Sequence, residues 1–243
     1  MRRLRAILAL GILVLASWQL GASQTNLARI TIESDGWLLV GDLRMPRAKR
    51  ATVPVVLMLN KANGNRAVYA DLADQLALHG IASLRLDMRA HGESSNKGKF
   101  GPPFDEKMLA LLNGSENDVT AAVAFLKNTK GIDPTRIGVV GASYSGEQMA
   151  VSGRKNGYGK AYVALSPGSF SDESIAAIDT SGARWIFVRS ADERHLKGLH
   201  ENIRKLSKTA ELLEVAGDKH ATELLDSAPG LTEMITGWFK RNL

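Results

Sequence analysis

Gly141-Ala142-Ser143-Tyr144-Ser145-Gly146 is the stretch that decides the fold. It follows an apolar, β-type run at 137–140 and precedes residues typical of a helix start at 147–151. A serine at such a sharp strand-to-helix bend holds its hydroxyl out above a helix N-terminus, as in a nucleophile elbow with the pattern G-x-S-x-G. Ser145 replaces the last glycine and is still small enough for strand and helix to approach closely. The alternative is a Gly/Ser-rich turn in an ordinary βα unit.

The segments around this stretch alternate between strand-type and helix-type patterns. Residues 27–32 and 37–43 flank Asp35-Gly36 and predict a β-hairpin. Apolar runs that suit buried strands follow at 53–59, 81–87, 136–141, 161–165, 185–188 and 212–215. Helical spacing occupies 68–77, 118–126, 144–153, 172–178, 193–206 and 221–243, and a short helix is expected at 106–112. This order predicts an α/β fold with a mostly parallel sheet, helices on both faces, a leading hairpin and little or no cap domain.

The N-terminus predicts export. A basic start with Arg2, Arg3 and Arg5 precedes an uncharged apolar run at 6–20, and small residues at 21–23 suit cleavage before Gln24. This pattern is typical of a secretory signal peptide, and the run is short for a helix that spans a membrane. We therefore expect a signal peptide at 1–23, a single domain at 24–243 and a secreted or periplasmic protein without a membrane span in its mature chain. An uncleaved signal anchor is the alternative.

Composition excludes several function classes. The chain has 243 residues, a formal net charge of +6 and no cysteine. Without cysteine, disulfides, zinc–thiolate sites and a cysteine nucleophile are excluded. The basic cluster at 47–50 is interpreted as a solvated hairpin tip, so no nucleic-acid partner is expected.

The polar residues after the later strands predict a catalytic triad. A serine hydroxyl needs a neutral imidazole to accept its proton and a carboxylate to orient that imidazole. Such groups gather at the carboxyl ends of parallel strands. Asp192 follows the strand at 185–188, with Glu193 as the fallback acid, and His220 follows the strand at 212–215. The order Ser143, Asp192, His220 is the one expected for this topology.

Three motifs together resemble small α/β-hydrolase fold serine hydrolases of the serine aminopeptidase-like and dienelactone hydrolase-like type. The elbow and the loop Gly217-Asp218-Lys219-His220 are two of them. The third, Asp87-x-Arg89-x-His91-Gly92-x-Ser94, resembles the D-x-R-G-H-G-x-S loop of that family, with Ala90 in place of a glycine. The resemblance covers roughly 37–240 and implies a structural role for His91.

The resemblance also implies an oxyanion hole formed by the backbone N–H groups of Tyr144 and Ala62. Asn60-Lys61 replaces the family's H-G dipeptide in that loop. Backbone donors do not depend on side-chain identity, so a hole can still form. Two positions are open for Lys61: near the oxyanion, where it would add positive charge, or in solvent.

These residues together predict a serine hydrolase that cleaves a carboxylic ester through an acyl-enzyme on Ser143, with a small-molecule substrate and no metal or cofactor. A peptidase or amidase with the same triad, transfer of the acyl group to an acceptor other than water, and a non-catalytic binding protein on a degenerate hydrolase fold are the alternatives. The segment 95–115 is either a partial lid over the site or a loop packed onto the body.

Overall fold

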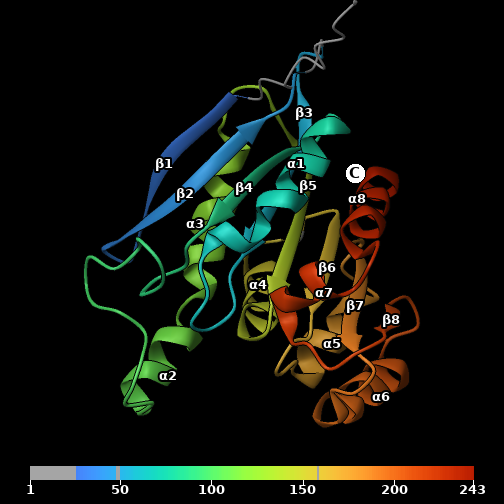
Figure 1. Cartoon of the computed structure of the whole chain (residues 1–243). Helices are drawn as coiled ribbons and strands as arrows, with labels where there is room; N and C mark the ends of the chain where they lie inside the picture. The colour runs from blue at the N-terminus through green and yellow to red at the C-terminus, as the bar shows by residue number, and fades with distance from the viewer. Residues whose placement is uncertain (1–25, 48–49, 158) are drawn as a thin grey trace, which may run out of the picture.

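The computed structural model describes residues 26–47, 50–157 and 159–243. An eight-stranded sheet runs through the molecule in the order β1-β2-β4-β3-β5-β6-β7-β8 (Figure 1). The predicted signal peptide at 1–23 lies outside the described residues, so its prediction stays open. The strands are β1 (Asn26–Ser34), β2 (Trp37–Met45), β3 (Val53–Leu59), β4 (Ala82–Leu86), β5 (Ile132–Ala142), β6 (Ala161–Leu165), β7 (Arg184–Ser190) and β8 (Glu211–Val215).

The sheet is parallel except at its N-terminal edge. The hairpin β1–β2 pairs antiparallel, and β2 also pairs antiparallel with β4. All other neighbouring strands, from β4 through β3 to β8, run parallel. The carboxyl ends of β5, β6, β7 and β8 therefore meet at one edge, and the loops that leave these strands are neighbours in space.

Helices cover both faces of the sheet. The α-helices are α1 (Ala70–Leu78), α2 (Glu106–Asn113), α3 (Glu116–Lys127), α4 (Tyr144–Asn156), α5 (Asp172–Ile178), α6 (Lys197–Leu206), α7 (Leu224–Ser227) and α8 (Leu231–Asn242). Short 3-10 turns precede three of them, at Arg66–Tyr69, Arg194–Leu196 and Ala221–Glu223. Buried side chains of α3, α4, α5 and α6 share one core cluster, and those of α1, α7 and α8 share the other. These two cores confirm the predicted α/β-hydrolase architecture.

Strand β3 shows how the sequence produces two cores. All seven of its residues are buried. Val55, Leu57 and Leu59 join the core under α3 and α4, whereas Val56 and Met58 join the core under α1 and α8. Because successive strand side chains point to opposite faces, a continuous apolar run can fill both layers at once.

The long connection between β4 and α3 contains only α2 and the motif that begins at Asp87. The buried Asp87 carboxylate accepts hydrogen bonds from the Arg66 and Glu93 N–H groups at 2.6 and 2.9 Å and is paired with the Arg66 guanidinium. A Cβ at Gly92 would lie 2.1 Å from Asp87 Oδ2, and the φ of Gly92 is +49°. This position therefore requires glycine.

Arg89 and Asp118 join this connection to α3. Arg89 Nε and Nη2 donate to Asp118 Oδ1 at 2.9 and 2.7 Å, and the Arg89 N–H donates to Asp118 Oδ2 at 2.8 Å. Ala90, which replaces the family's glycine, takes a left-handed φ of +63°. The surrounding hydrogen bonds thus hold a conformation that is costly for a residue with a Cβ.

Among the described residues, the longest helices are neither long nor apolar enough to cross a membrane.

The buried side chain of His200 makes the free energy of unfolding depend on pH. His200 in α6 is 1% exposed, and burial, the main cause, lowers the pKa of its imidazole to about 4. An unfolded chain binds that proton near pH 6.5, so the folded state loses stability as the pH falls from about 6.5 to about 4. The loss amounts to about 3 kcal/mol at most.

His200→Leu should remove this component. Urea unfolding at pH 8 and pH 4.5 should show a smaller loss of unfolding free energy at acid pH in the variant than in the wild type. Equal losses in the two proteins would contradict the assignment to His200.

Candidate active site

Ser143 lies on a strained bend between β5 and α4. Its φ and ψ are +55° and −122°, a conformation that non-glycine residues rarely adopt. Its N–H donates to the Leu165 carbonyl at 2.9 Å, and its carbonyl accepts from the Gly146 N–H at 3.1 Å. These bonds fix the backbone of a half-buried serine at the carboxyl edge of the sheet, as the nucleophile elbow requires.

The small residues around Ser143 allow this close packing. A Cβ at Gly141 would lie 2.8 Å from the Ser145 carbonyl oxygen, and a Cβ at Gly146 would lie 2.9 Å from Pro167 Cβ. Ser145 is fully buried, and its hydroxyl accepts from the Ala142 N–H at 2.7 Å and donates to the Ala142 carbonyl at 3.0 Å. Serine can therefore replace glycine at this position without leaving a buried hydroxyl unsatisfied.

His220 is bound to a buried carboxylate. The distance between His220 Nδ1 and Glu193 Oε1 is 2.6 Å. The other oxygen, Glu193 Oε2, accepts from the Ser166 hydroxyl at 2.7 Å and from the Ser190 N–H at 2.8 Å. Glu193 is 3% exposed, so its charge is removed from bulk water but is met by three hydrogen-bond donors.

This contact shows that Glu193, and not the expected Asp192, is the acid bound to His220. The Glu193 N–H donates to the Ser190 carbonyl at 3.2 Å and closes a turn after β7. Asp192 lies at the exposed tip of this turn, where its N–H donates to the Gly217 carbonyl at 3.0 Å. The fallback acid of the sequence analysis therefore lies next to the imidazole, because the turn directs the later of the two acids back toward the sheet.

A buried arginine supports the same turn. Arg189, 3% exposed, donates through Nη1 to the carbonyls of Ser190 and Ala191 at 2.9 and 3.2 Å. Its Nη2 donates to Glu214 Oε1 of β8 at 2.7 Å. The loop that carries Glu193 is thus bound to both β7 and β8 by charge-assisted hydrogen bonds.

The loop after β8 places the imidazole against this carboxylate. The Lys219 carbonyl accepts from the Ser190 hydroxyl at 2.6 Å, and the His220 carbonyl accepts from the Glu223 N–H at 3.1 Å. An ionised carboxylate can only accept hydrogen bonds, so the ring proton lies on Nδ1 and leaves Nε2 as an acceptor. The side chain is 34% exposed, so this nitrogen is available at the surface of the site.

Contacts between adjacent strand ends connect the serine to this pair. Ser143 binds Leu165 at the end of β6, the next residue Ser166 binds Glu193 after β7, and Glu193 binds His220 after β8. A Cβ at Gly168 would lie 3.6 Å from Ser143 Oγ, so the loop after β6 passes directly beside the hydroxyl. The sequence analysis missed Ser166, although its position after a buried strand was a usable signal.

The loop after β3 contains Ala62, the residue expected from the sequence to supply the second oxyanion donor. The Gly64 N–H donates to the Lys61 carbonyl at 3.0 Å, which closes a turn with Ala62 as its second residue. Within the described residues, the N–H groups of Ala62 and Tyr144 donate to no protein acceptor. Asn60 is fully buried and accepts from the Met88 N–H at 2.9 Å, so it anchors the start of this turn.

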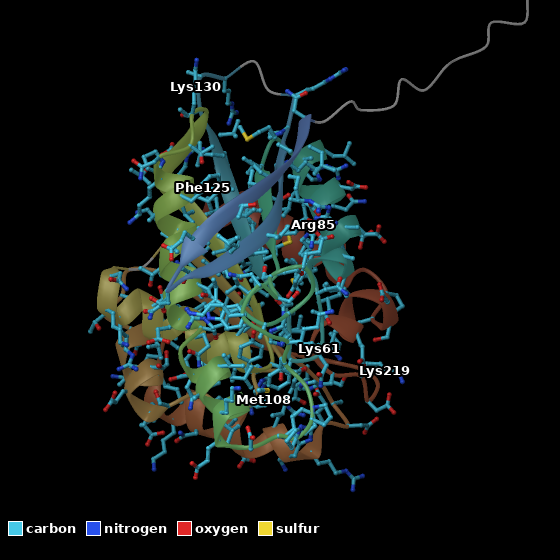
Figure 2. All side chains as sticks on the ribbon, turned by 90° about the vertical axis from the view of Figure 1, so that its left-hand side faces the viewer. Lys61, Arg85, Met108, Phe125, Lys130 and Lys219 are labelled. Carbon is cyan, nitrogen blue, oxygen red and sulfur yellow. The ribbon has the colours of Figure 1, made fainter. Side chains whose placement is uncertain are left out.

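Lys61 forms an ion pair that the sequence did not predict. Its Nζ pairs with Glu223 Oε1 at 2.5 Å, and this ion pair lowers the pKa of the Glu223 carboxyl. Glu223 follows His220 by three residues, so the pair joins the loops after β3 and β8. Lys61 lies toward the same end of the molecule as Lys219 and Met108, away from Lys130 (Figure 2).

A series of aromatic rings in contact connects Tyr144 with the segment that precedes α2. The His91 ring stacks on Tyr144 and on Phe100 with centroid distances of 5.7 and 5.0 Å, and Phe100 contacts Phe104 at 5.6 Å. His91 is 4% exposed and its Nδ1 lies 2.8 Å from the Arg89 carbonyl oxygen, which supports a structural role. Phe104 is 61% exposed, so the aromatic series runs from the elbow to the surface.

Comparisons with known proteins place the chain in a family. Residues 42–222 match the family model described as Dienelactone hydrolase family, and this span contains Ser143, Glu193 and His220. The chain belongs to the dienelactone hydrolase family. Two uncharacterized proteins of Mycobacterium tuberculosis are 29% identical to it over 116 residues, which cover 47% of this chain and 36% of each relative. The match thus spans about a third of the length of these relatives.

Solved structures share the fold at low sequence identity. Dienelactone hydrolase from Anabaena variabilis superposes with a TM-score of 0.67 at 16% identity, covering 90% of this chain and 97% of that one. Est1E from Butyrivibrio proteoclasticus with ferulic acid bound gives a TM-score of 0.67 at 19% identity, covering 87% and 96%. These likenesses show the shared fold.

The two acids after β7 make a matched pair for mutagenesis. Glu193→Gln should lower kcat on an activated aryl ester by about 10³-fold or more, because an amide cannot hold the imidazole in the required tautomer. Asp192→Asn removes a charge one residue away and should change kcat by less than about threefold. Steady-state kinetics on both variants would contradict this assignment if Asp192→Asn caused the larger loss.

Proposed function

We propose that this chain is a serine hydrolase that cleaves carboxylic esters through an acyl-enzyme on Ser143. The observation that best supports this proposal is the 2.6 Å contact between His220 Nδ1 and the buried Glu193 carboxylate. That contact orients an imidazole as a base beside the edge of the sheet where a strained serine is held. Membership of the dienelactone hydrolase family supports the hydrolase part of the proposal.

In the first step, Ser143 Oγ attacks the ester carbonyl carbon while His220 Nε2 accepts the hydroxyl proton. Glu193 stabilises the imidazolium that results, since its carboxylate already accepts the Nδ1 proton. The carbonyl oxygen becomes an oxyanion, and the N–H groups of Tyr144 and Ala62 are the donors we assign to it. The imidazolium then protonates the leaving alkoxide as the carbon–oxygen bond breaks, which leaves the acyl group on Ser143.

In the second step, water replaces the alcohol. His220 removes a proton from the water, the hydroxide attacks the acyl carbon, and the proton returns to Ser143 Oγ as the acid product leaves. The hydrogen bonds from Ser166 and Ser190 keep Glu193 fixed through both steps. The rate advantage comes from this preorganisation, because no donor has to reorient when charge develops.

A small ester with an apolar or aromatic acyl group is the substrate class that we propose. The series of rings from Tyr144 through His91 and Phe100 to the exposed Phe104 supports it, and the structural neighbour Est1E has been solved with ferulic acid bound. A hydroxycinnamate ester is therefore a suitable first substrate, with the matching amide as the comparison that distinguishes an esterase from an amidase.

We further propose that the protein acts outside the cytoplasm after cleavage of residues 1–23. The basic start, the short apolar run and the small residues before Gln24 support export. The mass of the exported protein tests this proposal directly, since cleavage would leave Gln24 as the first residue.

Treatment with a fluorophosphonate followed by intact-mass analysis tests the serine nucleophile. One stoichiometric adduct is expected on the wild type and none on Ser143→Ala, and ester turnover by the variant should fall by about 10³-fold or more. Ser169→Ala is the matched control, because Ser169 is exposed in the loop beside Ser143 and should leave the adduct in place.

Absence of an adduct on the folded wild type would overturn the proposal and favour a binding protein on a hydrolase fold. An adduct that persists in Ser143→Ala would assign the reactive group to another residue. Rapid acyl-enzyme formation with little acid product, relieved by added alcohols or amines, would indicate acyl transfer in place of hydrolysis.

A further inference from the structure

A second histidine lies beside the triad and has no part in the mechanism above. His195 belongs to the 3-10 turn at Arg194–Leu196, and its ring centroid lies 6.3 Å from that of His220 with an angle of 43° between the planes. Ligand atoms of Glu193, His195 and His220 all lie within 4.8 Å of one another. Two imidazoles and one carboxylate thus converge at the surface of the active site.

The turn that presents His195 is well fixed. The Arg194 N–H donates to the Asp192 carbonyl at 2.8 Å, and the Leu196 N–H donates to the Glu193 carbonyl at 2.9 Å. Leu196 is 3% exposed and anchors the turn in the protein. The backbone of His195 is therefore held near Glu193 and His220, while its side chain is exposed.

The chemistry of these three groups suits a borderline divalent metal ion. Imidazole nitrogens and a carboxylate oxygen are common zinc ligands, at about 2.0–2.2 Å from the metal. Magnesium and calcium prefer oxygen ligands only. A tetrahedral zinc places two ligand atoms about 3.3 Å apart. Rotation of the exposed His195 side chain adjusts only the distances to His195, and the ion replaces the 2.6 Å hydrogen bond between Glu193 and His220.

We propose that Glu193, His195 and His220 form an inhibitory Zn²⁺ site in which the metal competes with catalysis for the triad. Glu193 and His220 contribute the groups that the reaction uses, and His195 supplies the third ligand. Solvent completes the tetrahedral coordination. The site itself follows from the geometry alone, and its inhibitory consequence rests on the proposed serine hydrolase function.

Zinc inhibits the reaction in either case, whether Nε2 or Nδ1 of His220 binds the ion. If Nε2 binds, its lone pair is no longer available for the Ser143 proton. If Nδ1 binds, the single ring proton of the neutral imidazole lies on Nε2, which then cannot accept a proton. A metal on the Glu193 carboxylate also removes the acceptor that orients the ring.

Zinc titration of the purified full chain, measured both by calorimetry and by ester turnover, tests the site. The wild type should bind one Zn²⁺ and lose at least about tenfold in activity at saturation, and a chelator should restore it. His195→Gln should weaken zinc binding and raise the half-inhibitory concentration by about tenfold or more. Each variant is compared with itself with and without metal.

His79→Gln is the matched control, because it removes an exposed histidine at the C-terminal end of α1 and should leave zinc binding unchanged. Mg²⁺ at the same concentration should neither bind nor inhibit. Zinc binding that His195→Gln leaves intact would overturn the proposal, even if the chain is an active hydrolase. Zinc binding that depends on His195 in a protein without esterase activity would uphold the site and reject the function.

Discussion

The hydrogen bond between His220 Nδ1 and Glu193 Oε1 joins the loops that follow two adjacent strands, and Ser166 adds the loop of a third. Burial makes this bond possible and also costly, because an unpaired carboxylate at 3% exposure would lose most of its hydration. The Ser166 hydroxyl and the Ser190 N–H offset that cost. The carboxyl edge of the sheet is therefore organised around the buried Glu193 carboxylate. This carboxylate accepts hydrogen bonds from three different segments of the chain.

The connection after β4 is held in place by two further buried carboxylates. Asp87 pairs with Arg66, and Asp118 pairs with Arg89, and both carboxylates are fully buried. Ion pairs of this kind contribute little net stability, but loss of one partner typically costs about 3–5 kcal/mol. They shape the connection after β4 that stacks His91 on Tyr144, the residue next to Ser143. The loops on both sides of Ser143 are thus fixed by satisfied charges more than by apolar packing.

The fold could be predicted from the sequence because its signals are local and repeated. The strand at 53–59 and the helix at 172–178 have the predicted bounds, since an apolar run or a helical spacing determines each of them. The elbow could be predicted as well, because a Cβ at Gly141 or Gly146 would lie within 3 Å of neighbouring atoms, so the bend requires small residues. The hairpin followed from one Asp-Gly turn.

The choice between Asp192 and Glu193 could not be made in the same way. Both acids follow the same strand, and only the hydrogen bond that closes the turn at Ser190 decides which one faces His220. The ion pair of Lys61 with Glu223 could not be predicted from the sequence either, because it joins residues separated by 162 positions. Ser166 gave only the weak signal of a serine after a buried strand, and His195 carries no motif, so the structure was needed to place both beside Glu193 and His220.

Proton NMR of the His220 imidazole tests the central claim most directly. A ring proton held between Nδ1 and a buried carboxylate at 2.6 Å should resonate far downfield of the backbone amides and exchange slowly with water. The account predicts that this signal is present in the wild type and in Asp192→Asn and is lost in Glu193→Gln. Loss of the signal in Asp192→Asn, with retention in Glu193→Gln, would contradict it.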